Sequence, residues 1–170
     1  MLNLLFSLFF SGRLFLPGPV ALEAVLSLQG LRAAVEQYFD AWNPKNEKRL
    51  VVSLREQKMY VFHQRTLLAV LTVSTGRNQY TPEGNFRIYY KKKLVRAFNG
   101  DHIRYWMEFK PKFGIHGLPF DKNGLEIGAD DLGSPVSAGC IRVNTPEAGL
   151  LYRFVPRHSL LMVQNNPPSF

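Results

Sequence analysis

The chain of 170 residues contains only one cysteine, Cys140. An intramolecular disulfide is therefore excluded, and packing has to supply the stability of the fold. The four histidines have no metal-ligand spacing among themselves or with Cys140, so the sequence predicts no metal site. Repeats, low-complexity tracts and internal linkers are absent too. These absences leave one domain, long enough to build its own core.

Acidic residues are the minority: 21 Lys and Arg face 13 Asp and Glu, a net charge of +8. Many of the basic residues fall between positions 87 and 112. Such a cluster suits a nucleic-acid face, attraction to an anionic cell envelope, or lysines that protect sheet edges. No nucleic-acid fold signature accompanies it. The sequence therefore favours edge protection with envelope attraction and predicts no nucleic-acid partner.

The N-terminal segment, residues 1–20, contains a short apolar run rich in Leu and Phe and has no positive n-region. The run is too short to span a membrane and has the size of a signal-peptide h-region. The prediction is an export signal or weak membrane anchor, with a hydrophobic segment docked on the domain as the alternative. In residues 21–44, apolar side chains recur every three or four positions, which predicts a helix that ends at Asn43-Pro44.

From Arg49 the apolar period changes to two, as in β-strands. The pattern predicts a mainly β domain over residues 48–164, followed by a loose tail at 165–170. A short helix is expected from Thr145, as N-cap, to about Phe154, because Pro146 suits a first turn and Glu147 lies near the positive helix end. Strands are predicted at 50–55, 59–62, 66–72, 86–90, 105–109 and 160–163.

Cys140 stands in the stretch Ser-Ala-Gly-Cys-Ile-Arg-Val-Asn, residues 137–144. A lone cysteine is most often a small buried hydrophobe. Here glycine precedes it and Arg142 follows it, a setting that suits an accessible thiolate. If Ile141 and Val143 face the core of a strand, then Cys140, Arg142 and Asn144 share the other face. His116 lies upstream between Ile115 and Gly117, and a loop-presented histidine distant in sequence is a candidate base for such a thiol.

Three motifs in order resemble one enzyme family. They are Thr81-Pro82-Glu83-Gly84 (preceded by Val73 to Gly76), then His116-Gly117, then Ser137 to Arg142. The motifs and their order are similar to those of the YkuD-type L,D-transpeptidases, cysteine enzymes that cross-link bacterial peptidoglycan. The resemblance runs from about Lys48 to Val163. Two departures are visible: Ala138 stands where many members have histidine, and the segment 118–136 between base and nucleophile is longer than usual.

The resemblance implies a curled β-sandwich of two sheets, with one short helix after the catalytic strand and an N-terminal helix outside. It implies Cys140 as nucleophile and His116 as base, oriented by the carbonyl of Gly117. Release of D-Ala from a tetrapeptide stem gives an acyl-enzyme, which a second amine resolves into a 3→3 cross-link. Supporting roles fall to Gly139 and Ser137 at the oxyanion site and turn, and to Arg142, Trp106, Tyr105 and Asn144 on the substrate side.

For Tyr105 and Trp106 the sequence leaves two interpretations open, a sheet core or the apolar wall of a substrate cleft. No cofactor is implied. The implied partners are peptidoglycan stem peptides, with carbapenem-type β-lactams as inhibitors, and the implied location is the periplasm or cell wall. Three alternatives remain: an L,D-carboxypeptidase that uses water, a variant that attaches a lipoprotein, and an inactive envelope-binding module.

Overall fold

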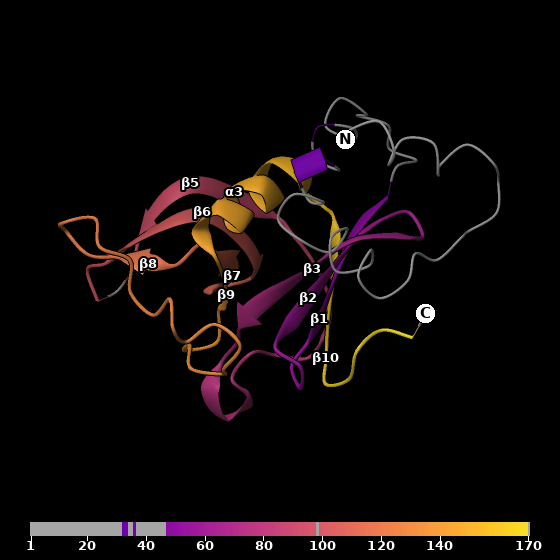
Figure 1. Ribbon diagram of the computed structural model, residues 1–170, viewed down its shortest axis with the longest axis horizontal. Coiled ribbons are helices and arrows are strands. Elements are labelled where there is room, and N and C mark those ends of the chain that lie inside the picture. Colours follow the sequence, from indigo (N-terminus) through magenta and orange to yellow (C-terminus); the bar gives the residue numbers. More distant parts are fainter. Residues whose placement is uncertain (1–31, 34–35, 37–46, 98, 170) are drawn as a thin grey trace, which may run out of the picture.

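The computed structural model describes residues 32–33, 36, 47–97 and 99–169 (Figure 1). The described part is mainly β, with one α-helix, α3 (Thr145–Phe154), and a short 3-10 helix, η2 (Arg77–Gln79). The strands are β1 (Lys48–Ser53), β2 (Lys58–His63), β3 (Thr66–Ser74), β4 (Gly84–Arg87), β5 (Tyr90–Arg96), β6 (His102–Lys110), β7 (Phe113–His116), β8 (Pro119–Phe120), β9 (Ile141–Val143) and β10 (Leu160–Gln164).

The strands form one path in the order β4-β10-β1-β2-β3-β9-β7-β6-β5, with β8 paired to β6. The long strand β3 belongs to both halves of this path. Its first part, to Thr72, pairs with β2, and its last residues, Val73 and Ser74, pair with β9. The path curls back on itself and brings its two ends together: Phe86 of β4 packs on Phe109 of β6, with ring centroids 5.2 Å apart.

One apolar core fills the space enclosed by the curled sheet. Alternation along the strands sends every second side chain into it, as the period of two predicts. Leu50 and Val52 of β1 enter from one half, and Met107, Ile115 and Ile141 from the other, all at most 1% exposed. A smaller cluster on the other face of β1 and β2 contains Val51, Tyr60 and Phe62.

Helix α3 contributes a buried side of Ala148, Leu150, Leu151 and Phe154 and packs against β6 and β7. Its C-terminal carbonyls are capped by a lysine of the basic cluster: Lys91 Nζ donates to the carbonyls of Tyr152 and Val155, both at 2.5 Å. Burial lowers the pKa of Lys91 to about 8. A cation at this end of a helix is favourable, since the carbonyls there carry the negative end of the dipole.

The predicted strands are found, with shifted boundaries. The strand expected at 86–90 is divided into β4 and β5, β6 begins at His102 instead of Tyr105, and β3 continues to Ser74. Asn144, not Thr145, is the N-cap of α3, and no side chain caps this helix end. The Oγ1 of Thr145 instead accepts a hydrogen bond from the amide of Leu118 at 3.0 Å.

The hydrophobic segment 1–20 and most of the helix expected over 21–44 lie outside the described residues. Within residues 21–44 only Arg32, Ala33 and Glu36 are described; all three are exposed, and they do not establish the expected helix. Among the described residues, no helix has the length and apolar character needed to cross a membrane.

Phe154→Ala should lower the free energy of unfolding by about 3 to 5 kcal/mol, because it empties a fully buried site between α3 and the sheet. Urea denaturation followed by far-UV circular dichroism measures the change. Arg153→Ala is the matched control on the exposed side of the same turn, with an expected change within about 0.5 kcal/mol. Equal effects of the two substitutions would contradict this packing of α3.

Candidate active site

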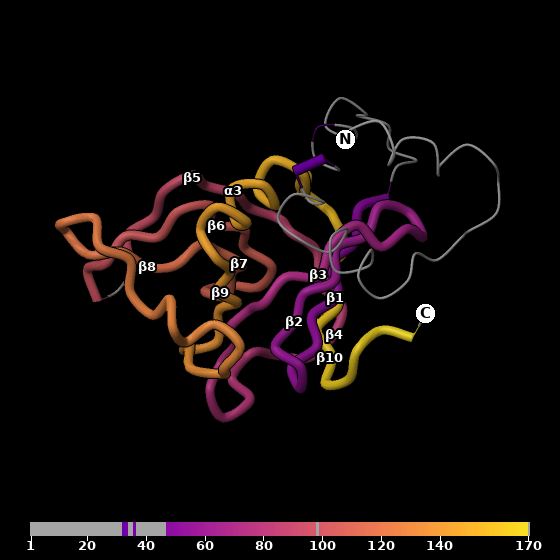
Figure 2. The backbone as a smooth tube through the Cα atoms, viewed as in Figure 1, coloured from indigo at the N-terminus to yellow at the C-terminus, as the bar shows by residue number. Residues whose placement is uncertain are grey.

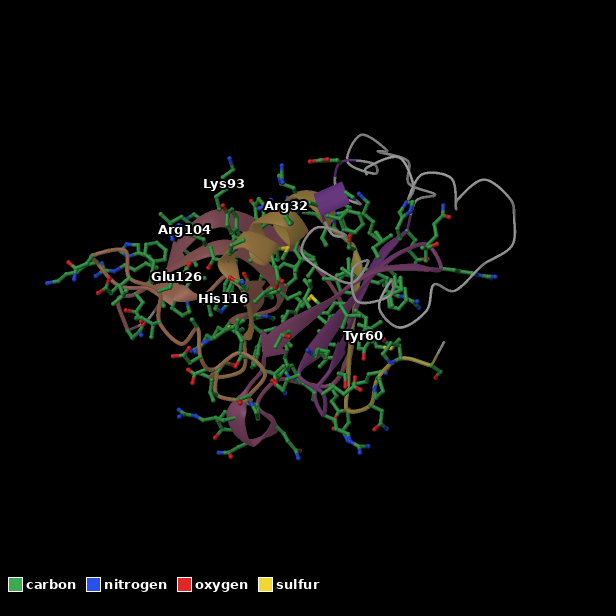
Figure 3. All side chains as sticks on the ribbon, in the orientation of Figure 1. Arg32, Tyr60, Lys93, Arg104, His116 and Glu126 are labelled. Carbon is green, nitrogen blue, oxygen red and sulfur yellow. The ribbon has the colours of Figure 1, made fainter. Side chains whose placement is uncertain are left out.

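The pairing of β7 with β9 sets the geometry of the site. The two strands are parallel neighbours, with Ile115 opposite Ile141 and His116 opposite Arg142. Both isoleucines are fully buried in the core. Because side chains alternate along a strand, His116 and Arg142 project from the opposite face, and Cys140, two residues before Arg142, lies on that face as well. Figure 3 shows His116 close to α3, away from Tyr60 in the other half of the sheet.

The turn before Cys140 is held by Ser137. Its hydroxyl donates to the carbonyl of Cys140 at 2.6 Å and accepts from the amide of Gly139 at 3.0 Å. Gly139 has φ +123°, and a Cβ there would lie 2.5 Å from the ring of Phe113. Only glycine fits both the backbone conformation and the space. The Gly139 amide is bonded to Ser137, whereas the amides of Ala138 and Cys140 donate no hydrogen bond among the described residues.

The motifs that are far apart in sequence meet behind this turn. The hydroxyl of Thr81 donates to the carbonyl of Gly139 at 2.9 Å and accepts from the amide of Gly76 at 2.7 Å. A Cβ on Gly76 would lie 2.6 Å from the Thr81 nitrogen and 2.9 Å from the Gly139 Cα. Thr81 is 1% exposed. Thr81, the first residue of the Thr-Pro-x-Gly motif, is therefore a buried support behind the turn that precedes Cys140.

The sulfur of Cys140 lies 3.7 Å from the carbonyl oxygen of Lys112, in the turn between β6 and β7. Burial raises the pKa of the Cys140 thiol, and the charge of Glu108 raises it as well. A hydrogen bond from the Gly114 backbone and the positive charge of Arg142 act in the opposite direction. The balance is an elevated pKa, so the resting side chain is a neutral thiol at neutral pH.

His116 is 2% exposed, and its Nδ1 lies 2.6 Å from the carbonyl oxygen of Gly117. A carbonyl only accepts, so the neutral ring carries its proton on Nδ1 and keeps a lone pair on Nε2. Burial lowers the pKa of His116 to about 4; the Gly117 hydrogen bond raises it, and the charge of Arg142 lowers it further. At neutral pH the ring is therefore an uncharged acceptor on the same face as the thiol.

Trp106 covers the histidine ring. The two rings stack with centroids 5.6 Å apart and an interplanar angle of 21°. The indole reaches this position across Gly114, where a Cβ would lie 2.8 Å from the ring. Trp106 is thus half-buried against His116, and glycine at position 114 makes room for it.

The other expected site residues are placed differently. Arg142 is half-buried and forms no ion pair with any described residue. Tyr105, with φ +62°, packs on α3, its ring 5.8 Å from that of Tyr152, and does not share the stack of Trp106 on His116. Asn144 lies at the N-terminus of α3, where its carbonyl accepts from the amide of Ala148. Ala138 is exposed in the turn that precedes Cys140.

The segment 118–136 begins with β8 and ends against β3, as the tube in Figure 2 shows. The amide of Gly133 donates to the carbonyl of Val73 at 2.9 Å, and the hydroxyl of Ser74 donates to the carbonyl of Ser134. A shallow hollow of about 480 Å³ lies between β5, β6 and residues 120–124, and Cys140, His116 and Arg142 are not among the residues that line it. In the described part of the chain, no three His, Cys, Asp or Glu side chains are grouped for a metal ion.

Comparison with known proteins identifies the family of the chain. The family model of the L,D-transpeptidase catalytic domain (YkuD) matches residues 47–163. The chain belongs to this family. Its relative YciB of Bacillus subtilis strain 168, named as an L,D-transpeptidase, is 27% identical over 122 residues, which are 66% of this chain and 63% of YciB.

Solved L,D-transpeptidases share the fold. A structure from Mycobacterium smegmatis has a TM-score of 0.60 at 18% identity, and the match covers 70% of this chain and 59% of the M. smegmatis chain. The L,D-transpeptidase LdtMt1, solved in complex with imipenem, also has a TM-score of 0.60 at 18% identity, and the match covers 70% of this chain and 59% of the LdtMt1 chain. This chain therefore spans less than two thirds of the length of these family members.

Three features of the site escaped the sequence analysis: the buried support from Thr81, the Lys112 carbonyl beside the sulfur, and Glu108 near the reacting groups. Alternation along β6 places residues 106 and 108 on the same face, so the sequence could have predicted that Glu108 lies beside Trp106. The sequence analysis considered only the aromatic residues of this strand. Backbone groups such as the Lys112 carbonyl leave no signal in a sequence.

The depressed pKa of His116 predicts a pH-dependent loss of stability. The unfolded chain binds a proton on this ring near pH 6.5, whereas the folded protein binds it only near pH 4. The stability from the neutral ring is therefore complete above about pH 6.5 and is lost as the pH falls towards 4, by an amount on the order of 3 kcal/mol. Urea denaturation at a series of pH values measures it.

His116→Gln should remove this component, whereas the exposed His158→Asn should keep it. If the wild type and His116→Gln lost stability in parallel between pH 6.5 and 4, the buried neutral state of His116 would be contradicted.

Proposed function

We propose that the chain is a cysteine-dependent L,D-transpeptidase of peptidoglycan, with Cys140 as the nucleophile and His116 as the base. The observation that carries the proposal is the hydrogen bond of Nδ1 to the Gly117 carbonyl. It fixes the tautomer in which Nε2 is free to accept a proton, on the face of the sheet that also carries the thiol. A backbone carbonyl does here what a carboxylate does in other triads.

The neutral state of both groups defines the first step. As the sulfur attacks the carbonyl carbon of the third stem residue, its proton passes to Nε2 of His116. The C–N bond to the terminal D-Ala then breaks, and the imidazolium returns the proton to the leaving amine. The product is a thioester on Cys140. Because the ion pair is not formed in advance, the thiolate develops only where an acyl carbon receives it.

The second step uses the same atoms in reverse. A side-chain amine of a second stem attacks the thioester, His116 takes a proton from that amine, and the sulfur leaves and is reprotonated. The amide bond that forms is the 3→3 cross-link. The Cys140 amide, which is without a partner among the described residues, is the proposed donor to the oxyanion. Gly139 supports it by its conformation, while its own amide is bonded to Ser137.

Arg142 is proposed to hold a carboxylate of the stem peptide. The guanidinium is half-buried next to the proposed reacting pair without an ion pair among the described residues, so a substrate carboxylate can bind a parallel pair of its N–H donors. Trp106 provides an apolar wall beside His116. Tyr105 and Asn144 serve the site only indirectly in this proposal, through α3 and its N-terminus. The enzyme acts on the cell wall after export.

Carbapenems are the proposed inhibitors. A family member has been solved in complex with imipenem, and the β-lactam carbonyl is a strained acyl donor for a thiol. Ring opening transfers the thiol proton, by way of His116, to the lactam nitrogen, and leaves the opened ring as a thioester on Cys140.

Incubation with a disaccharide-tetrapeptide should release D-Ala and give a cross-linked dimer, and Cys140→Ala should abolish both. Intact-mass analysis of protein and product measures the two outcomes together. Release of D-Ala without a dimer would replace the proposal by an L,D-carboxypeptidase. A lipoprotein amine as the preferred acceptor would indicate an attaching enzyme. A folded protein that forms no adduct with the tetrapeptide or imipenem would indicate a binding module.

Two substitutions separate the effect of the positive charge of Arg142 from the effect of its paired N–H donors. Arg142→Gln removes a charge that lowers the pKa of Cys140, so alkylation of the thiol should need a higher pH. Arg142→Lys keeps the charge and should leave that pH midpoint in place. Both should raise KM for the tetrapeptide by about 10- to 100-fold, the cost of a charged, two-donor contact. An unchanged KM in Arg142→Gln would contradict the carboxylate contact.

A further inference from the structure

Glu108 is an acidic side chain on the face of β6 that carries the site. Its neighbours in the strand, Met107 and Phe109, are buried in the core, so the carboxylate projects to the same face as Trp106. It lies opposite Gly114 in the register of β6 and β7, two residues before His116. Its charge reaches the Cys140 sulfur, whose pKa it raises.

Three donors from three segments converge on this one carboxylate. The indole Nε1 of Trp106 donates to Oε2 at 3.3 Å. The hydroxyl of Tyr89, between β4 and β5, donates to Oε1 at 2.7 Å, and the amide of Lys112 donates to the same oxygen at 3.1 Å. Glu108 therefore joins the edge of the sheet, the Trp106 ring and the turn from β6 to β7.

Two of these three bonds lead directly to the reacting groups. The Trp106 ring that Glu108 holds is the ring stacked on His116. The Lys112 residue whose amide Glu108 holds presents its own carbonyl 3.7 Å from the Cys140 sulfur. Lys112 has φ +72°, a left-handed conformation that is unfavourable for a non-glycine residue and that persists only when its surroundings stabilise it.

We propose that Glu108 is a positioning residue for the reaction, which holds Trp106 against His116 and the Lys112 turn against Cys140. The inference rests on the proposed roles of Cys140 and His116. Glu108 touches neither of them by a hydrogen bond and acts through the two groups that do pack on them.

The chemistry of the three donors requires a carboxylate. An ionised carboxylate accepts at both oxygens, whereas an amide accepts at one and donates at the other. In Glu108→Gln the amide nitrogen faces either the Trp106 N–H or the Lys112 N–H, and each is only a donor. Tyr89 can adapt, because a hydroxyl also accepts. Glutamine at this position therefore loses one of the two contacts that lead to the reacting pair, whichever way it turns.

The charge of Glu108 and its hydrogen bonds have opposite expected effects on the reactivity of Cys140, and this makes the inference testable. Removing the charge should make Cys140 more acidic, because Glu108 raises its pKa. Losing a contact should displace Trp106 or the Lys112 turn and slow the acyl transfer. A residue with only a structural role would lower the folded fraction without moving the titration of the thiol.

The experiment compares Glu108→Gln, Glu108→Asp and wild type in the full chain. Alkylation of Cys140 by iodoacetamide across pH, followed by intact mass, gives the titration of the thiol. The rate constant of imipenem acylation at neutral pH gives the reactivity of the pair. Glu126→Gln removes an exposed carboxylate that is not among the groups acting on the Cys140 pKa, and it is the matched control. Circular dichroism verifies that each variant is folded.

Glu108→Gln should move the alkylation midpoint to lower pH and yet slow acylation by about 10- to 100-fold, the cost of misplacing reacting groups by around 1 Å. Glu108→Asp keeps the charge but is shorter, so it should slow acylation with less change in the midpoint. Glu126→Gln should match the wild type in both measurements.

Acylation of both Glu108 variants at the wild-type rate would overturn the positioning role while leaving the proposed function intact. A reduced reactive fraction with an unchanged rate constant and midpoint would also overturn it, since that is the result of partial unfolding alone. Failure of the folded wild type to form an imipenem adduct would instead overturn the proposed function, and the inference would fall with it.

Discussion

The pairing of β7 with β9 is the constraint on which the rest of the site depends. The two strands are short, Phe113–His116 and Ile141–Val143, and they come from distant parts of the chain. Their alignment is fixed by Ile115 and Ile141, which meet in the core, and by β3, which pairs with β9 on its other side. A slip by one residue would turn His116 and Arg142 into the core and the isoleucines to solvent. The register that buries the core is thus the register that assembles the candidate catalytic pair.

Within this frame the electrostatics favours a pair that is neutral at rest. Burial acts on both groups in the direction of the uncharged form, lowering the pKa of His116 and raising that of Cys140. Arg142 opposes a charged imidazole and favours a thiolate, while Glu108 disfavours the thiolate. These charges do not create an ion pair before the substrate binds. In the proposed reaction, proton transfer then waits until the acyl carbon and its oxyanion donors can stabilise the product, as in a preorganised catalytic site.

The sequence predicted the parts of this protein that are expressed as local patterns. The period of two located the sheet, and the side chains of Ile141 and Val143 face the core as expected. The two expected sheets are found as the two halves of the strand path, and β3 joins them by pairing with β2 in one half and with β9 in the other. This joining through β3 was not predicted, because pairing between distant segments leaves no local trace. The prediction that Thr145 is the N-cap was wrong for a similar reason. Its hydroxyl accepts a hydrogen bond from the amide of Leu118, a contact set by the tertiary structure, and does not cap the helix. Cys140 and His116 could be selected from sequence context, whereas Glu108 could not, since its importance lies in three donors that come together only in three dimensions.

Much of the chemistry at this site is held by backbone groups. The carbonyl of Gly117 sets the tautomer of His116, and the carbonyl of Lys112 lies beside the Cys140 sulfur. The carbonyls of Gly139 and Cys140 accept hydrogen bonds from Thr81 and Ser137 and so hold the turn that precedes Cys140. A carbonyl cannot be removed by substitution, so side-chain changes affect it only by altering the conformation that aims it. The sensitive positions are then those that fix backbone conformation, such as Gly139 with its positive φ and the Glu108 contact to the strained Lys112 turn. This distinction explains how the exposed position 138 can carry alanine beside the nucleophile: its side chain takes part in none of the hydrogen bonds that hold the turn.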